Sequence, residues 1–99
     1  MSVKAELQGT QLTLHVKGLF DINLYEAFNE SYKLYLNQVN QIIIDFSQTT
    51  SIDSAALGLM LLLRQKFGAD DANICLINAN DAVRKVLDIA QFGQLFDLH

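Results

Sequence analysis

Two short apolar runs, separated by a segment long enough for a helix, most limit what this chain can fold into. The runs are QIIIDF at 41–46 and NICLIN at 73–78. Continuous apolar runs of this length are typical of strands covered on both faces. Residues 54–67 between them have a helical pattern, with Gly68 as the expected stop. Strands separated by a helix of this length pair in parallel, so the sequence predicts an α/β fold.

The other elements follow from the period of the apolar residues and from turn and cap residues. They are two alternating strands at 3–8 and 11–17 around the turn Gly9-Thr10, a helix from Leu24 to about Gln38, a helix capped by Asn80 or Asp81, and a brief strand at 95–98. The apolar stripes of these two helices are Leu24, Ala27, Phe28 and Tyr35, and Val83, Val86, Leu87 and Ala90. The predicted order is β-β-α-β-α-β-α-β in a single domain over residues 1–99. Its sheet is mostly parallel, with an antiparallel first strand.

Composition limits the compartment and the classes of partner. Apolar residues are 51% and charged residues 18% of the 99 residues, which is enough for one core. The net charge of −4 comes without a basic stripe that could bind nucleic acid or an anionic membrane surface. The N-terminus has no apolar signal core, and the longest apolar run is about half of a membrane span. We expect a cytoplasmic protein that is a monomer when free and binds neither nucleic acid nor membrane.

A metal site or a reactive thiol is not expected. Cys75 lies in the apolar run ICLI, where a free cysteine is usually an inert core residue. His15 shares the polar face of its strand with Thr13 and Lys17, so we expect a solvated side chain. His99 is the last residue, and we expect it to be frayed. Neither histidine has a cysteine, a histidine or an acid at metal-ligand spacing, so no metal and no cofactor are predicted.

The segment SIDSAALGLMLLLR at 51–64 places an acid and a hydroxyl at the start of an apolar helix. In such folds partners meet the loops at the carboxyl ends of parallel strands. Two of these loops, GLFD at 18–21 and SQTTSID at 47–53, carry acids next to helix starts. A phosphate on Ser54 would lie where free N–H groups and the helix dipole favour negative charge. The simpler interpretation is that Asp53 or Ser54 is only an N-cap.

Residues 55–63 leave this helix without a polar face for about two and a half turns. A helix that is apolar all round is either wholly buried or covered on its outer side by something else. Full burial of one helix is difficult in 99 residues. The alternative is an exposed patch of small residues and leucine, and such patches mark interaction sites. Both possibilities remain open at this point.

These residues carry a resemblance to a known family. IIIDFSQTTSIDSAALGLMLLL at 42–63 resembles the signature of STAS-domain anti-sigma-factor antagonists. That signature is a strand ending in Asp-Φ-Ser, a loop, and then Φ-Asp-Ser-small-small-Leu-Gly at the start of an apolar helix. GLFD at 18–21 is similar to the Gly-x-Φ-Asp of the family, and residues 78–98 resemble its C-terminal helix and strand. The resemblance covers nearly the whole chain and implies a single STAS-like domain.

The resemblance also implies a non-enzymatic signalling role in bacterial transcription regulation by partner switching. The unphosphorylated domain binds an anti-sigma factor that is often also a serine kinase, phosphorylation breaks the complex, and a PP2C-type serine phosphatase restores it. By position, the phosphoacceptor is Ser54. The implied partner-binding residues are Asp21, Asp53, Ser54, Ala55, Leu57, Gly58 and Leu61. The chain departs from the family at Ala55-Ala56, where many members have Ser-Gly or Thr-Gly.

Two other functions remain as alternatives. An enzyme with Ser54 as nucleophile would need His15 or His99 as its base, and residues 52–56 lack the two glycines of the Gly-x-Ser-x-Gly turn. A nucleotide site is not predicted either, because GADDAN at 68–73 is acidic and lacks the lysine of a phosphate-binding loop. STAS domains also serve as regulatory subunits of ABC transporters, including lipid transporters, where the same helix docks an ATPase.

Overall fold

The computed structural model describes residues 2–99. They form a β-hairpin followed by alternating helices and strands. In chain order the elements are β1 (Ser2–Gln8), β2 (Gln11–Phe20), the 3-10 helix η1 (Ile22–Leu24), α1 (Tyr25–Tyr32), β3 (Gln41–Ile52), α2 (Ser54–Phe67), the 3-10 helix η2 (Ala69–Asp71), β4 (Ile74–Ile77), α3 (Asp81–Ile89), the 3-10 helix η3 (Phe92–Gln94) and β5 (Asp97–Leu98).

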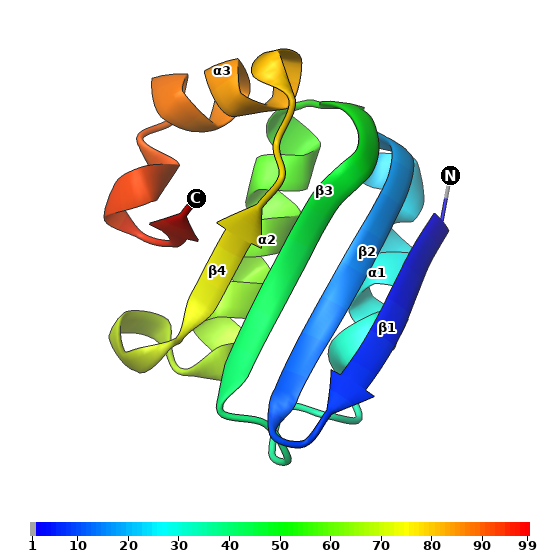
Figure 1. The fold of residues 1–99 in the computed structure, drawn as a ribbon, viewed down its shortest axis with the longest axis vertical. Helices are drawn as coiled ribbons and strands as arrows, with labels where there is room; N and C mark the ends of the chain where they lie inside the picture. The colour runs from blue at the N-terminus through cyan, green and yellow to red at the C-terminus, as the bar shows by residue number, and fades with distance from the viewer. Residues whose placement is uncertain (1) are drawn as a thin grey trace.

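One sheet, ordered β1-β2-β3-β4-β5, organises these elements. β1 and β2 pair antiparallel, and every later neighbouring pair is parallel. Figure 1 shows α1 and α2 behind the sheet and α3 beyond the carboxyl end of β4. The predicted fold class, element order and antiparallel first strand are therefore confirmed. No helix within residues 2–99 has both the length and the apolar character needed to cross a bilayer.

The core lies between α1, α2 and one face of the sheet. Leu12 and Leu14 of β2 are fully buried, as their alternation predicts. In β3, Ile42 and Ile44 are also fully buried, but Ile43 between them is only half-buried. The prediction that this strand is covered on both faces is wrong, because α1 and α2 lie against the same face and leave the other open (Figure 1).

β3 is twelve residues long and continues through 47–52, which are predicted above to form a loop. β2 is also longer than predicted, and the two strands stay paired to their last residues with two register shifts. The polar residues Ser47, Gln48 and Thr50 in this part of β3 are accommodated because they are exposed. Thr49 is the buried exception, and its hydroxyl donates to the carbonyl of Val16 at 2.7 Å. Of the two predicted loops, a single residue is left in each case. Asp53 connects β3 to α2, and Asp21 connects β2 to η1.

α1 ends at Tyr32, six residues before the predicted end near Gln38. Beyond it the chain tightens into i to i+3 turns, because the N–H of Tyr35 bonds to the Tyr32 carbonyl and the N–H of Gln38 bonds to the Tyr35 carbonyl. Ala27, predicted to face the core, is exposed. Tyr32 is fully buried instead, and its hydroxyl donates to Asn29 at 2.6 Å.

α3 begins after Asn80, whose side-chain oxygen accepts a hydrogen bond from the N–H of Val83 at 2.8 Å. Asn80 is therefore the N-cap, one of the two predicted residues. Val83 and Leu87 are fully buried, but Ala90 is exposed because the helix ends before it. The strand predicted at 95–98 is reduced to β5, since η3 and a turn take up the residues before it.

Candidate functional site

Asp53 is the N-cap of α2. Its carboxylate accepts a hydrogen bond from the N–H of Ala56 at 3.2 Å, and its own N–H bonds to the carbonyl of Phe20 at 3.4 Å. Ser54 is the first helical residue and is exposed, and none of the hydrogen bonds within residues 2–99 involves its hydroxyl. The capping interpretation is therefore confirmed for Asp53, and the Ser54 hydroxyl is left available.

Asp21 lies beside Asp53 because β2 and β3 end next to each other. The last residues of these strands, Phe20 and Ile52, are paired in register. Asp21 caps η1 by accepting a hydrogen bond from the N–H of Asn23 at 2.9 Å. Both acids line one small pocket of about 140 Å³. Within residues 2–99 neither carboxylate forms an ion pair, so two negative charges without a basic partner lie at this edge of the sheet.

One face of α2 is exposed and mostly apolar. Residues three and four apart share a helix face, and this stripe consists of Ser54, Gly58, Leu61, Leu62 and Gln65. The side chains of Leu61 and Leu62 are 40% and 36% exposed. The opposite face packs in the core through Ala56, Leu59, Met60 and Leu63. Of the two possibilities for this helix, full burial is therefore wrong, and an exposed apolar stripe is what the fold leaves.

Gly58 lies in the middle of this exposed stripe, where glycine weakens a helix by about 1 kcal/mol relative to alanine. Apart from its chain neighbours and the backbone of its own helix, a Cβ atom built on Gly58 would meet no atom within 4 Å, so packing within the domain does not require a glycine there. Glycine does permit the close approach of another molecule to the helix backbone. Ala55 and Leu57, both half-buried, border the stripe on either side of this point.

The charge near Ser54 is negative, and the first basic residue along the helix is engaged elsewhere. Arg64 lies about 15 Å farther along α2 at the standard helical rise. It donates to the carbonyl of Leu95 and to the carboxylate of Asp70, each at 3.2 Å. A phosphate on Ser54 would therefore meet the N-terminal end of the helix dipole but no guanidinium from Arg64.

Three exposed leucine and isoleucine side chains next to this site were not predicted. Leu19 is 51% exposed, Ile22 is 60% exposed, and the third is Leu62 of the stripe. Leu19 also lines the pocket that holds Asp21 and Asp53. The alternation of β2 could have identified Leu19, because residues 13, 15, 17 and 19 share the open face of the sheet. No local pattern indicates Ile22, whose exposure results from its place in η1.

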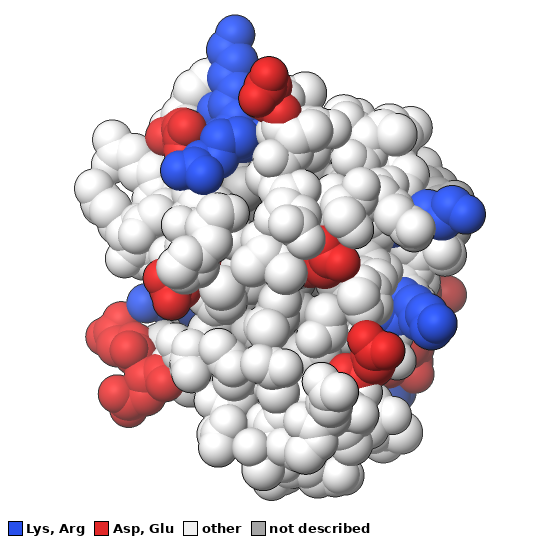
Figure 2. All heavy atoms as spheres, in the orientation of Figure 1, with Lys and Arg blue, Asp and Glu red and all other residues white. Residues whose placement is uncertain are grey.

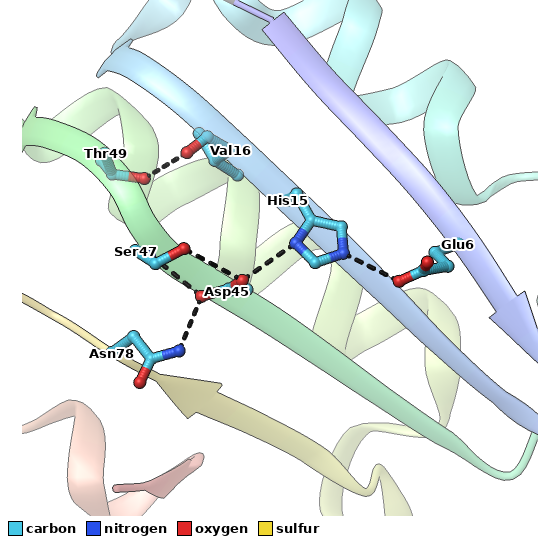
Figure 3. Close-up of polar contacts among 7 residues, drawn as sticks. All are labelled: Glu6, His15, Val16, Asp45, Ser47, Thr49 and Asn78. Atoms are coloured by element: carbon cyan, nitrogen blue, oxygen red, sulfur yellow. Dashed lines mark hydrogen bonds and ion pairs between the residues drawn. The ribbon is translucent and has the colours of Figure 1, made fainter.

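A polar network around Asp45 lies on the open face of the sheet (Figure 3). His15 Nδ1 is 2.9 Å from Asp45 Oδ2, and His15 Nε2 is 3.1 Å from Glu6 Oε1. Asp45 Oδ1 also accepts hydrogen bonds from the Asn78 amide and from the Ser47 N–H, each at 3.0 Å. The prediction of a merely solvated His15 is wrong, because β1 and β3 each bring a carboxylate to its ring.

This network shifts the pKa values of both central groups. The hydrogen bond to Glu6 raises the pKa of His15 above its ordinary value, with a further contribution from Asp45 and against the effect of burial. Burial alone would raise the pKa of Asp45, but hydrogen bonds from Asn78, Ser47 and His15 outweigh it, so the pKa of Asp45 is lowered. The arrangement therefore favours an imidazolium beside a carboxylate.

The structure does not bring His15 next to Ser54, as a serine nucleophile would require. Ser54 follows the end of β3, which is paired with Phe20, whereas His15 lies five residues earlier on β2. Five strand residues span about 16 Å. The other candidate base, His99, lies beside β4, one strand away from β3. Neither histidine shares a hydrogen bond with Ser54 in the part of the chain that the structure describes.

Cys75 and His99 both lie at the β4–β5 pair, Cys75 within β4 and His99 directly after β5. Cys75 is 8% exposed, and burial, together with the nearby charge of Asp97, raises the pKa of its thiol. The thiol form therefore prevails at neutral pH, as expected of a core cysteine. The N–H of His99 donates to the carbonyl of Leu76 at 2.9 Å, so the expectation of a frayed His99 is wrong for its backbone.

Charges on the open face of the sheet are dispersed. Figure 2 shows acidic and basic side chains on this face as small separate groups within a largely uncharged surface. A shallow hollow of about 510 Å³ there is lined by both signs of charge, from Lys4, Lys17, Glu6 and Asp45. This face of residues 2–99 therefore offers no continuous basic surface of the kind that binds nucleic acid phosphates.

The fold and the sequence match one family of known proteins. Residues 2–99 match the family model of the STAS domain. A STAS-domain containing protein of Pseudomonas aeruginosa (strain UCBPP-PA14) is 37% identical over 90 residues, which are 91% of this chain and 89% of that protein. The chain belongs to the STAS-domain family.

Solved structures of anti-sigma factor antagonists share its fold. SpoIIAA in its unphosphorylated form superposes with a TM-score of 0.83 at 21% identity, covering 99% of this chain and 88% of that one. The phosphorylated form of the Bacillus protein gives 0.75 at 20% identity, with 99% and 91% covered. An anti-sigma factor antagonist from Mycobacterium paratuberculosis gives 0.78 at 16% identity, with 99% and 84% covered. At these identities the likeness establishes the fold.

Proposed function

We propose that the protein is an anti-sigma factor antagonist that acts by partner switching in the cytoplasm. In the unphosphorylated state it binds an anti-sigma factor that is also a serine kinase. Phosphorylation of Ser54 releases this partner, and a PP2C-type serine phosphatase regenerates the binding form. The domain supplies a docking surface and a phosphoacceptor, and the partners supply the catalysis. Membership of the STAS family supports this, as does the fold shared with SpoIIAA, which has been solved both unphosphorylated and phosphorylated.

The observation that carries this proposal is the position of Ser54 at the end of the exposed stripe of α2. Its side chain is exposed and without a hydrogen bond within residues 2–99, while Asp53 caps the helix. Leu61 lies seven residues on along the same face, about 10 Å away. A kinase can therefore reach the hydroxyl, and a phosphate added there lies at the border of a surface that a partner would cover.

We take the docking surface to be the part of the α2 stripe from Ser54 to Leu62, together with the acidic edge beside it. Its proposed members are Asp21, Asp53, Ser54, Ala55, Leu57, Gly58 and Leu61, to which we add the exposed side chains of Leu19, Ile22 and Leu62. A complementary partner would place apolar side chains on the leucines, and basic groups opposite the two acids that have no ion pair in residues 2–99. Gly58 would allow the partner to approach the helix backbone closely.

The sign of the switch follows from these charges. A phosphate can create contacts where arginine residues surround it, or disrupt them where the surroundings are acidic or apolar. Next to Ser54 are Asp53 and the pocket shared with Asp21, while Arg64 is bonded to Asp70 and Leu95. The added phosphate dianion should leave the fold unchanged and weaken partner binding. It would repel acidic groups of the partner, and its water of hydration would have to be removed when the partner covers it.

A capture and labelling experiment tests this function. The Ser54→Ala variant, which cannot be phosphorylated at that position, is used to capture its partner from an extract of the source cells for identification by mass spectrometry. The captured kinase and ATP are then added to the unmodified protein, and the modified residue is mapped. We expect one phosphate on Ser54 and none on the Ser54→Ala control.

Two results would contradict the proposal. One is phosphate on Ser47, Thr50 or Ser51 with Ser54 unmodified, since these hydroxyls lie in β3 rather than at the helix start. The other is capture of a transporter ATPase in place of a serine kinase, which would assign the domain to the alternative role of a transporter subunit.

A further inference from the structure

Three potential metal ligands of different chemistry come together at the C-terminal strand. Ligand atoms of Cys75, Asp97 and His99 all lie within 4.8 Å of one another. The group is separate from the α2 surface that carries the proposed function, because it is built by β4 and β5. The distance between position 75 and positions 97 and 99 in the sequence explains why ligand spacing did not predict it.

The register of the parallel pair β4–β5 explains the cluster. Cys75 is the direct partner of Asp97 in the pairing. His99 is two residues after Asp97, and residues two apart on an extended chain point to the same face. The hydrogen bond from the His99 N–H to the Leu76 carbonyl continues the ladder and holds His99 in line with β5. Backbone pairing therefore places all three side chains on one face of the sheet.

The donor set suits zinc or a similar divalent transition metal. A thiolate, an imidazole and a carboxylate are the three kinds of protein ligand that Zn²⁺ takes, and three protein ligands leave its fourth position for water. Bonds of about 2.0–2.2 Å to nitrogen and oxygen place two tetrahedral ligand atoms about 3.3–3.5 Å apart. His99 Nε2 and Asp97 Oδ1 are already 3.2 Å apart. The other separations are no longer than 4.8 Å. Because Zn–S bonds are about 2.3 Å, these separations need to close by at most about 1.3 Å.

The environment can provide that movement. The side chains of His99 and Asp97 are 62% and 67% exposed, so both can adjust by rotamer changes without disturbing the core. Cys75, in contrast, is buried and fixed in β4. A cation can therefore enter from the solvent side and find one rigid sulfur ligand and two mobile ligands.

We propose that Cys75, Asp97 and His99 form a binding site for Zn²⁺ or a similar divalent transition metal. On binding, the Cys75 thiol loses its proton to solvent and its sulfur bonds to the metal, His99 binds through a neutral ring nitrogen, and Asp97 binds through a carboxylate oxygen. The bound metal would tie the C-terminal strand to β4. This site does not depend on the proposed phosphorylation of Ser54.

Cobalt is the direct probe, because Co²⁺ occupies zinc sites and gives a sulfur-to-metal absorption band when a thiolate binds it. The reduced protein is titrated with Co²⁺ and then with Zn²⁺, alongside Cys75→Ser, His99→Gln and the control His15→Gln. We expect one equivalent of Co²⁺, a thiolate band that Zn²⁺ abolishes, and the same result for His15→Gln. Cys75→Ser should lose the band, and His99→Gln should bind at least about 10-fold more weakly, since even an outer-shell change costs about 10–100-fold.

Three outcomes would overturn the site. They are the absence of a thiolate band on titration of the folded protein, a band of equal strength and affinity in His99→Gln, and Co²⁺ binding that is lost in His15→Gln but kept in Cys75→Ser. Circular dichroism verifies that each variant is folded. If Cys75→Ser does not fold, His99→Gln alone decides, because its side chain is exposed.

Discussion

The carboxylate of Asp53 accepts a hydrogen bond from the backbone N–H of Ala56, 3.2 Å away. This contact caps α2 and divides the two polar residues at the helix start into separate roles. Asp53 stabilises the helix, and Ser54 presents a hydroxyl to solvent. A serine that is not needed for folding can be modified without loss of the fold, which is what a phosphorylation switch requires.

This division predicts different costs for two alanine substitutions. Asp53→Ala removes the cap and should lower the free energy of unfolding by about 1 kcal/mol, the usual worth of such a residue. Ser54→Ala should change it by a few tenths of a kcal/mol at most, because alanine is the better helix former and no bond within residues 2–99 is lost. Urea unfolding monitored by circular dichroism measures both, with Asp53→Asn as a control that keeps a capping side chain. A larger loss for Ser54→Ala than for Asp53→Ala would show that the serine is structural.

Gly58 provides a substitution that should separate folding from binding. Gly58→Ala should raise the free energy of unfolding by roughly 0.5–1 kcal/mol, because its methyl group meets no atom within 4 Å and alanine favours the helix. The same methyl group should weaken partner binding, because it lies in the centre of the stripe. The control is Gln65→Ala, at the far end of the same stripe. Unchanged affinity of Gly58→Ala for the partner would remove this part of α2 from the docking surface.

Adjacent isoleucines in β3 should differ in their contribution to stability. Ile44→Ala should cost about 2–5 kcal/mol, as expected for a fully buried side chain facing the helices. Ile43→Ala should cost clearly less, since Ile43 is half-buried on the open face of the sheet. Urea unfolding of the two variants tests this. Equal costs would indicate that something covers the open face as well.

Local patterns predicted most of the fold, and the reasons for the exceptions are physical. The caps Asp53 and Asn80 could be predicted because a capping side chain bonds to a backbone N–H only three residues farther along the chain, so the contact is local in sequence. The length of β3 could not, because 47–52 are polar and become strand only by pairing with the end of β2. Burial on one face only, as at Ile43, depends on α1 and α2 packing on the same side of the sheet.

Part of the site was also predictable from the sequence. The positions of Asp21, Asp53 and Ser54 at neighbouring strand ends follow from the element order and the parallel pairing. The His15–Asp45 contact joins residues thirty apart in sequence, so no spacing rule indicates it. The contact depends on the pairing of β2 with β3, which places His15 directly opposite Asp45.

The pair formed by His15 and Asp45 should make stability depend on pH. The pKa of His15 is raised in the folded protein, so its contribution is full below the unfolded value of about 6.5 and is lost as pH rises through the folded pKa. The pKa of Asp45 is lowered, so its contribution is present above about 3.9 and is lost as pH falls through the folded pKa. Lys4 and Lys17 line the same hollow.

We therefore expect the free energy of unfolding to decrease as pH rises above about 6.5, the unfolded value of histidine, and through the raised pKa of folded His15. The decrease should be below about 1 kcal/mol, because Glu6 and part of the His15 ring are exposed to solvent. Urea unfolding at several pH values measures it, with His99→Gln as the matched control. If His15→Gln retained the full decrease, another group would be responsible.

The most direct test of the central claim is titration calorimetry of the captured partner with four forms of the protein. These are the unmodified protein, the protein phosphorylated on Ser54, Ser54→Ala and Ser54→Glu. Gln48→Glu, which adds the same charge to an exposed site on the open face, is the control. The account predicts that the unmodified protein, Ser54→Ala and Gln48→Glu bind alike, that the phosphorylated form does not bind, and that Ser54→Glu binds more weakly. Equal or tighter binding by the phosphorylated form would contradict it.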